Sequence, residues 1–198
     1  MIEVSTAQRG IYGDRICGDA VAVIERPRGV LVAVADGLGH GPLAHEASET
    51  FCGYVRAHHG ASLESLIVGS TTAMSSTRGA AVGLVDIDEA EGTLEYAGVG
   101  NIELRAVSRE RITPVSLPGI VGTRLRRVKS FRYTVSSEDL FAVFSDGVSS
   151  RFDLEDYRSL SSREIAERIL SDHGKQHDDA TCVIVRVDGA DVLRPSEP

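Results

Sequence analysis

Two short apolar runs, separated by a segment that contains proline and glycine, stand out in the first 40 residues of the chain. Residues 20–24 (AVAVI) and 30–35 (VLVAVA) are apolar throughout, and the segment 26–29 (RPRG) between them is rich in turn-forming residues. Runs of this length, rich in valine and isoleucine, are typical of buried strands. The pattern therefore predicts an antiparallel hairpin that brings the start of the first strand beside the end of the second.

Apolar residues at helical spacing predict three helices, over about residues 42–59, 63–74 and 162–173. Pro42 suits a first helical turn, and Ser62 is a typical N-cap residue. The spacing of Ser161 and Glu164 is that of a capping box, and Gly174 is a suitable C-terminal stop.

Further strands are expected outside these helices. They are placed over residues 80–87, 93–97, 102–107, 111–115, 140–144 and 182–187, with a basic strand-like stretch over 124–135. The mixed segment 1–16 is expected to contain a first strand that ends near residues 8–10. The strand over 111–115 is expected at a sheet edge, because Pro114 cannot donate to a ladder. Strands rarely alternate with helices along the chain, which favours an α+β fold with antiparallel sheets. The length of 198 residues suits a single domain, placed at 1–190, with 191–198 as a C-terminal tail.

Composition narrows the class of protein. The chain is 42% hydrophobic and 25% charged, which is typical of a globular domain, and its net charge of −8 argues against nucleic acid or an anionic membrane as a partner. Its three cysteines are far apart, which indicates reduced thiols rather than a zinc site or a disulfide framework. Without a signal-like N-terminus or an apolar run long enough to span a bilayer, the chain is expected to be cytoplasmic.

Four aspartates stand at predicted strand ends, beside glycine or a second acid: Asp19, Asp36, Asp146 and Asp178. If they converge, their carboxylates repel one another, and a divalent cation removes that cost. Oxygen ligands favour Mg²⁺, Mn²⁺ or Ca²⁺ over zinc. Two cations bridged by one carboxylate would activate a water for attack on phosphorus. The alternative is four unrelated aspartates that cap helices or stabilise turns.

Four segments resemble, in order, the motifs of the metal-dependent protein serine/threonine phosphatases (the PPM, or type 2C, family). They are residues 18–19 (GD), 35–41 (ADGLGHG), 144–147 (FSDG) and 178–181 (DDAT). The resemblance runs from about residue 10 to residue 187. It implies a four-layer αββα sandwich, with two antiparallel sheets flanked by helices. It also implies a phosphoserine/phosphothreonine protein phosphatase that uses two Mn²⁺ or Mg²⁺ ions.

The resemblance also implies a role for each motif residue. Asp36 corresponds to the carboxylate that bridges the two metals, and Gly37 to the carbonyl ligand beside it. Asp146 and Asp178 correspond to the remaining direct ligands of one metal. Asp19 matches the first acidic motif, where the family often holds the metal through water.

The chain departs from the family pattern at three points. Gly18 stands where many members carry a second acid, and Leu38 stands where larger members carry a histidine proposed as general acid. His40, two positions further on, becomes the candidate proton donor, with a loop-shaping or helix-capping role as the alternative. The arginine that binds substrate phosphate in larger members has no matching position here; Arg15 is the nearest candidate by spacing, and Arg9 is the alternative.

The DGLGHG form, the segments 78–81 (RGAA) and 98–101 (GVGN) and the short length are most similar to family members that act on the bacterial stressosome. This similarity implies phosphorylated scaffold proteins with STAS domains as substrates. Three alternatives remain open: a SpoIIE- or RsbU-like phosphatase acting on an anti-sigma antagonist, a non-catalytic phosphoprotein-binding module, and a phosphoesterase for small molecules. A basic cluster could steer a phosphoprotein or simply form a solvated edge; it comprises Arg124, Arg126, Arg127, Lys129 and Arg132.

Overall fold

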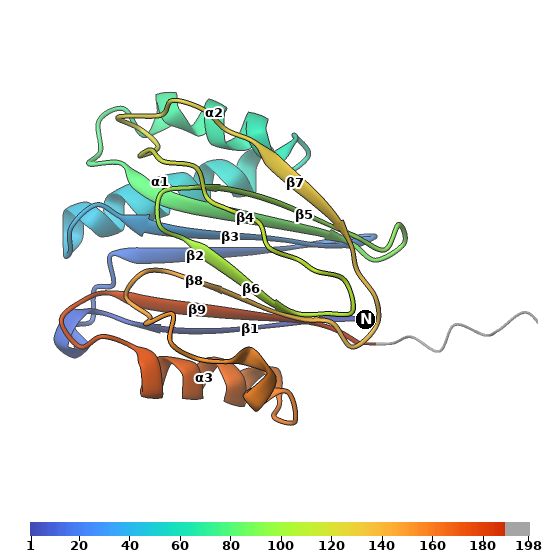
Figure 1. The fold of residues 1–198 in the computed structure, drawn as a ribbon. Coiled ribbons are helices and arrows are strands. Elements are labelled where there is room, and N and C mark those ends of the chain that lie inside the picture. The colour runs from blue at the N-terminus through green and yellow to red at the C-terminus, as the bar shows by residue number, and fades with distance from the viewer. Residues whose placement is uncertain (189–198) are drawn as a thin grey trace, which may run out of the picture.

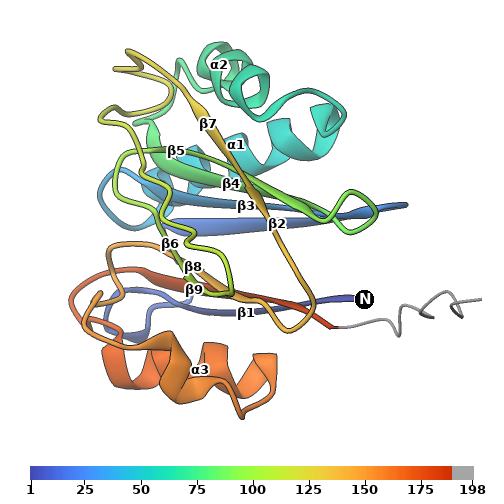
Figure 2. The same cartoon turned by 45° about the vertical axis from the view of Figure 1, so that its right-hand side comes forward.

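The structure, a computed structural model, describes residues 1–188 and forms a four-layer αββα sandwich (Figures 1 and 2). One sheet has the strand order β2-β3-β4-β5-β7 and the other β1-β9-β8-β6, with every neighbouring pair antiparallel. The first sheet contains β2 (Asp19–Arg26), β3 (Gly29–Gly37), β4 (Ala80–Asp88), β5 (Thr93–Val99) and β7 (Ser130–Thr134). The second contains β1 (Ile2–Arg9), β6 (Glu103–Val107), β8 (Leu140–Phe144) and β9 (Ala180–Val187). The predicted fold class is confirmed.

Helices cover the outer face of each sheet (Figure 1). Helices α1 (Pro42–His58) and α2 (Leu63–Ala73) lie on the first sheet, and α3 (Ser162–His173) lies on the second. The predicted caps form: Ser62 accepts a hydrogen bond from the backbone N–H of Ser65, and Ser161 and Glu164 form a capping box. Two short 3₁₀ helices, η1 (Ile11–Gly13) and η2 (Leu154–Tyr157), complete the elements.

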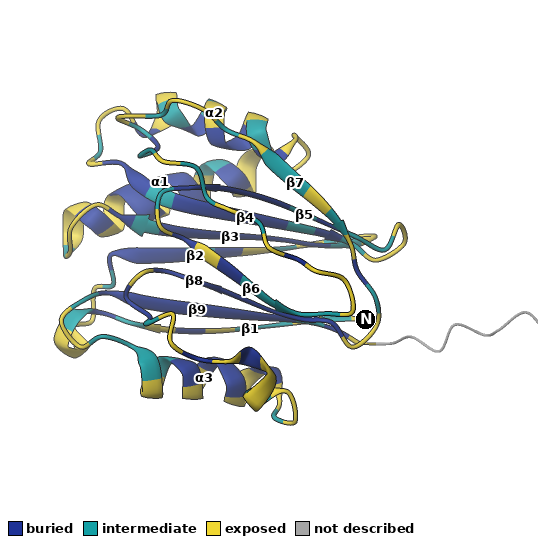
Figure 3. Cartoon of the chain, in the orientation of Figure 1, coloured by how far each residue is buried: buried dark blue, intermediate teal, exposed yellow. Residues whose placement is uncertain are grey.

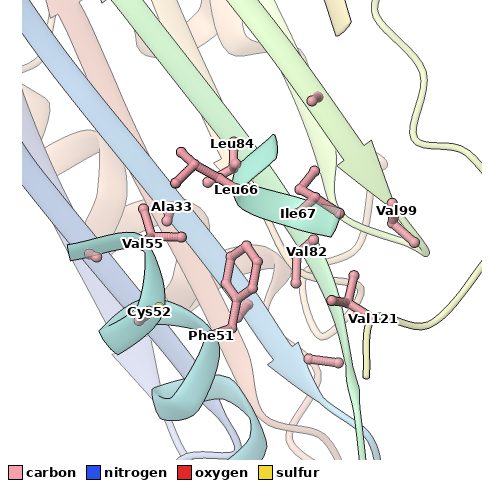
Figure 4. Close-up of a cluster of buried hydrophobic side chains, with 14 of the residues drawn as sticks. Ala33, Phe51, Cys52, Val55, Leu66, Ile67, Val82, Leu84, Val99 and Val121 are labelled. Atoms are coloured by element: carbon pink, nitrogen blue, oxygen red, sulfur yellow. The ribbon is translucent and has the colours of Figure 1, made fainter. Parts of the chain in front are cut away.

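Strand β3 is apolar without interruption because both of its faces are buried. Leu31 and Ala33 point toward the helices, whereas Val32 and Val34 point into the space between the sheets. Figure 4 shows the helix side, where Phe51 and its neighbours from α1 and α2 pack on the strands. The burial colours of Figure 3 place the most exposed residues on the outer faces of the helices and in the loops. This packing fixes the end of β3, and with it Asp36, within a rigid layer.

Three predicted strand boundaries are wrong. Residues 111–115 form no strand; Ile112 instead packs into the cluster between the sheets, while Pro114 keeps the segment irregular. Within 124–135, only Ser130–Thr134 pairs with β5. Strand β5 does not break at Gly98 but continues to Val99. A Cβ at position 98 would lie 2.5 Å from the Tyr96 hydroxyl, so glycine is required there by packing rather than by a turn.

The predicted tail over 191–198 lies outside the described residues. Among residues 1–188, no helix combines the length and the apolar character needed to cross a membrane.

Candidate active site

Asp19 and Asp36 stand directly opposite each other at the open end of the β2–β3 hairpin. This is the pairing that the apolar runs and the intervening turn predict. The backbone N–H of Gly37 donates to the carbonyl of Gly18 at 3.2 Å, which holds the two strands together just beyond the acids. Two carboxylates are therefore fixed side by side by backbone register alone.

Asp146 and Asp178 come from the other sheet. Asp146 follows β8, Asp178 precedes β9, and the two strands are antiparallel neighbours, so both acids lie at the same end of that sheet. Ser145 joins the two sheets at this end. Its hydroxyl donates to Asp19 Oδ2 at 2.7 Å and accepts from the backbone N–H of Thr181 at 3.0 Å. The four predicted acids are thus brought to one end of the sandwich.

A pocket of about 420 Å³ opens at this end, and its lining includes Asp36, Asp146 and Asp178. Asp19 does not line the pocket; it lies behind, with 3% of its surface exposed. Asn101, from the GVGN segment, also lines the pocket, and its Nδ2 donates to Asp146 Oδ2 at 2.7 Å. The sequence offered no chemical reason to select Asn101, since its partner lies 45 residues away.

The pocket is lined by acidic side chains and by no basic one, so the negative charges of the acids act on one another. Burial, and then the negative charges of Asp19, Asp146 and Asp178, raise the pKa of Asp36 to about 8. Burial raises the pKa of Asp19 to about 6, against hydrogen bonds from Ser145 and Thr181 that lower it. The pKa of Asp178 is raised by burial and by the charge of Asp146. The fold keeps these acids together at an electrostatic cost.

The donor set suits a hard divalent cation. It consists of carboxylate oxygens, and Asp19 Oδ1 is buried with no hydrogen-bond partner in the structure. Within residues 1–188, no three His, Cys, Asp or Glu side chains are gathered closely enough to hold a metal ion by themselves. An ion here would complete its coordination with backbone oxygen and water, as Mg²⁺ usually does. The residues present therefore fit a divalent metal that stays partly hydrated.

Asp179 is a buried acid to which the sequence assigned no role. Its side chain is 3% exposed, and its Oδ1 accepts from the backbone N–H of Ile11 at 2.9 Å. A Cβ at position 18 would lie 2.5 Å from Asp179 Oδ2. Gly18, where many type 2C members carry a second acid, thus leaves room for a carboxylate that arrives from another motif. The adjacent acids at 178 and 179 were the only sequence signal for it.

The structure does not bring every predicted residue to the pocket. Leu38 lines the pocket and is 50% exposed, whereas His40 is exposed on the same loop and is not among the lining residues. Arg15 is exposed in the connection between β1 and β2 and is likewise not a lining residue, and Arg9 donates to the carbonyl of Lys175. The roles of His40 and Arg15 stay predictions.

Two other features of the region bear on the chemistry. Burial, and then the charge of Asp19, raise the pKa of the Cys17 thiol to about 12, so Cys17 is neutral and is no candidate nucleophile. Lys175 donates from Nζ to the backbone carbonyl of Asp146, and its charge offsets part of the rise in the pKa of Asp178 that burial and Asp146 cause. The cations of the basic cluster are largely solvent-accessible, as expected for a charged edge.

The sequence of this chain is similar to those of known proteins. The sequence profile of Stage II sporulation protein E (SpoIIE) matches residues 26–188. The phosphoserine phosphatase RsbX of Bacillus subtilis (strain 168) is 28% identical over 190 residues, which cover 92% of this chain and 94% of RsbX.

Several solved structures have the same fold as this chain. A chain from a study of the bacterial stressosome as a modular system that controls secondary messenger signalling superposes with a TM-score of 0.89. It is 30% identical, with 94% of this chain and all of that chain covered. RsbX in complex with magnesium gives a TM-score of 0.84 at 25% identity, with 94% and 96% covered. The PP2C phosphatase domain of Bacillus subtilis SpoIIE shares the fold at a TM-score of 0.77, with 21% identity and with 95% and 64% covered. The chain therefore belongs to the SpoIIE family of PP2C-type phosphatase domains.

Proposed function

We propose that this protein is a cytoplasmic, divalent-metal-dependent phosphoserine/phosphothreonine protein phosphatase that dephosphorylates STAS-domain proteins of a bacterial stressosome. The observation that carries the proposal is the convergence of acids from two sheets at one pocket, three of which line it. The similarity to RsbX, a phosphoserine phosphatase, and to a stressosome structure supports the substrate class.

The proposed metal ligands are the motif residues. Asp36, with the backbone carbonyl of Gly37, would hold both of two Mn²⁺ or Mg²⁺ ions. Asp146 and Asp178 would be further ligands of one ion, and Asp19 would act through water. The magnesium complex of RsbX supports a divalent ion at such a site. When bound, the ions supply charge neutralisation and the activation of a water for in-line attack on phosphorus.

The residues of the chain prepare the site for that chemistry. Ser145 and Asn101 donate to Asp19 and Asp146, and each bond keeps one carboxylate oxygen in a fixed direction. Without cations, the pocket offers a phosphate dianion acidic side chains and no basic one, so substrate binding depends on metal loading. The account therefore predicts that chelation abolishes substrate binding as well as turnover.

Protonation of the leaving group is assigned to His40. Leu38 has no proton to give, and His40 is the nearest histidine along the same loop. We expect His40→Ala to slow hydrolysis of phosphoserine, whose alkoxide leaving group needs a proton, far more than hydrolysis of p-nitrophenyl phosphate. Equal losses with both substrates would contradict this role.

The proposal is tested by incubating the protein with a phosphorylated STAS domain in Mn²⁺, in Mg²⁺ and in chelator. We expect phosphate release with either metal and none in chelator or in Asp36→Asn. Asp172→Asn, an exposed substitution on α3, serves as the matched control. Metal-independent release would contradict the mechanism. Binding of the phosphoprotein without turnover would favour a non-catalytic module, and a preference for small phosphate esters would favour a small-molecule phosphoesterase.

A further inference from the structure

Arg78 lies beside the pocket on a backbone that is fixed on two sides. It stands in the connection between α2 and β4. The next residue, Gly79, accepts a hydrogen bond from the backbone N–H of Leu38 at 2.9 Å, and Ala80 donates to the carbonyl of Val121 at 3.0 Å. Since Leu38 lines the pocket, the backbone that carries Arg78 is attached directly to the pocket wall.

The guanidinium group of Arg78 lies against a glycine of the same wall. Its Nη1 is 2.9 Å from the point that a Cβ on Gly39 would occupy, and Gly39 lines the pocket with Asp36. Gly39 has φ +90°, a conformation that other residues rarely adopt. The missing side chain at position 39 therefore leaves the guanidinium a place at the edge of the pocket.

The donors of Arg78 are not used within the described part of the chain. Its side chain is exposed and makes none of the ion pairs or side-chain hydrogen bonds found among residues 1–188. Some other arginines have partners: Arg26 pairs with Asp86, and Arg105 and Arg186 donate to backbone carbonyls. Of the exposed arginines without such bonds, Arg78 is singled out by its position against Gly39. Arg78 is not itself a lining residue of the pocket, but its guanidinium lies against Gly39, which is one, and its donors are available to a ligand.

The charge of the pocket indicates what that ligand is. The pocket is lined by acids and by no basic residue, and the chain carries −8 overall, so a phosphate dianion needs positive partners besides the metal ions. A guanidinium can donate two parallel hydrogen bonds to two phosphoryl oxygens. We propose that Arg78 binds the phosphoryl oxygens of the phosphoserine substrate, in place of Arg15; this assignment rests on the proposed function of the site.

The experiment compares Arg78→Ala, Arg78→Lys and Arg15→Ala with the wild type, with Arg163→Ala on the outer face of α3 as the matched control. Two quantities are measured on the Mn²⁺-loaded protein: kcat and KM for a phosphorylated STAS domain, and the Kd for inorganic phosphate by calorimetry. Thermal unfolding is followed for every variant. Because Arg78 is exposed, its variants should unfold at the wild-type temperature.

We expect Arg78→Ala to lose about 10- to 100-fold in kcat/KM, mainly through KM, and to bind phosphate more weakly by a similar factor. Arg78→Lys should recover part of both losses, since it keeps the charge but not the fork. Wild-type values in Arg78→Ala, or a loss confined to Arg15→Ala, would overturn the inference. If the wild type releases no phosphate from any phosphoprotein yet binds inorganic phosphate through Arg78, the proposed function fails and Arg78 is left as a phosphate-binding residue without that substrate.

Discussion

Replacing Asp36 by asparagine should stabilise the metal-free protein while destroying the site. The substitution keeps the shape of the side chain but removes the charge at the centre of the acidic group. In the wild type, burial and three neighbouring carboxylates raise the pKa of this residue from 3.8 to about 8. Burying this carboxyl among other acids therefore lowers the free energy of unfolding, and the substitution removes that loss.

The magnitude follows from the size of the pKa shift. Each pKa unit corresponds to about 1.4 kcal/mol, so holding Asp36 in this environment costs at most about 4 kcal/mol at pH 7. Solvent screening of a half-buried carboxyl reduces this to about 2 kcal/mol. For a chain of 198 residues, that gain corresponds to a rise in Tm of about 4–8 °C.

The sign of the pH dependence is fixed by linkage. Between pH 3.8 and about 8, folded Asp36 holds a proton that the unfolded chain has released. The folded state is therefore favoured below this range, and the contribution of Asp36 to stability is lost as the pH rises through it. Asparagine does not titrate, so the advantage of Asp36→Asn should be small near pH 4 and largest near pH 8.

The assay is urea unfolding in chelator at pH 4.5 and pH 7.5, with Asp172→Asn as the control for losing an exposed acid. Addition of Mn²⁺ should then stabilise the wild type and leave Asp36→Asn unchanged, since only the wild type binds the ion tightly. A variant that is less stable than the wild type at pH 7.5 would refute the electrostatic reasoning. So would an advantage of equal size at both pH values.

Three further substitutions probe other parts of the structure. Gly18→Ala places a Cβ 2.5 Å from Asp179 Oδ2, and should lower the free energy of unfolding in urea by about 1–3 kcal/mol and weaken Mn²⁺ binding. Its control is Gly53→Ala, whose Cβ meets nothing within 4 Å and which should not lower the free energy of unfolding. Asn101→Ala removes the donor to Asp146, and should lower kcat/KM about 10-fold in a phosphatase assay with little change in Tm. Phe51→Ala empties a fully buried position of the core, and should cost about 3–5 kcal/mol in the same unfolding assay.

Much of the fold could be predicted because local pattern and tertiary packing agree. The apolar run of β3 and the turn before it predicted the hairpin, and the register that places Asp19 opposite Asp36 followed from that pairing. The capping box of α3 formed as expected, since Ser161 and Glu164 act within one helical turn. The sequence was least informative over 108–129, where Ile112 is buried by tertiary packing and no ladder forms.

Of the candidate site, the sequence predicted the acidic residues that lie within recognisable motifs. Asp36, Asp146 and Asp178 line one pocket, as convergence of strand ends requires. Asn101 and Asp179 were missed because their partners are distant in sequence and meet them only after folding. The proposed role of Arg78 could not be predicted either, since the approach of its guanidinium to Gly39 depends on how two connections pack together.

The most direct test of the two-ion proposal is a Mn²⁺ titration of the protein. Calorimetry measures the binding of the ion, and phosphate release from a phosphorylated STAS domain is measured in parallel at the same Mn²⁺ concentrations. The account predicts two ions per chain, turnover that rises as they bind, and neither binding nor turnover in Asp36→Asn. Turnover that is complete without metal, or retained in Asp36→Asn, would contradict it.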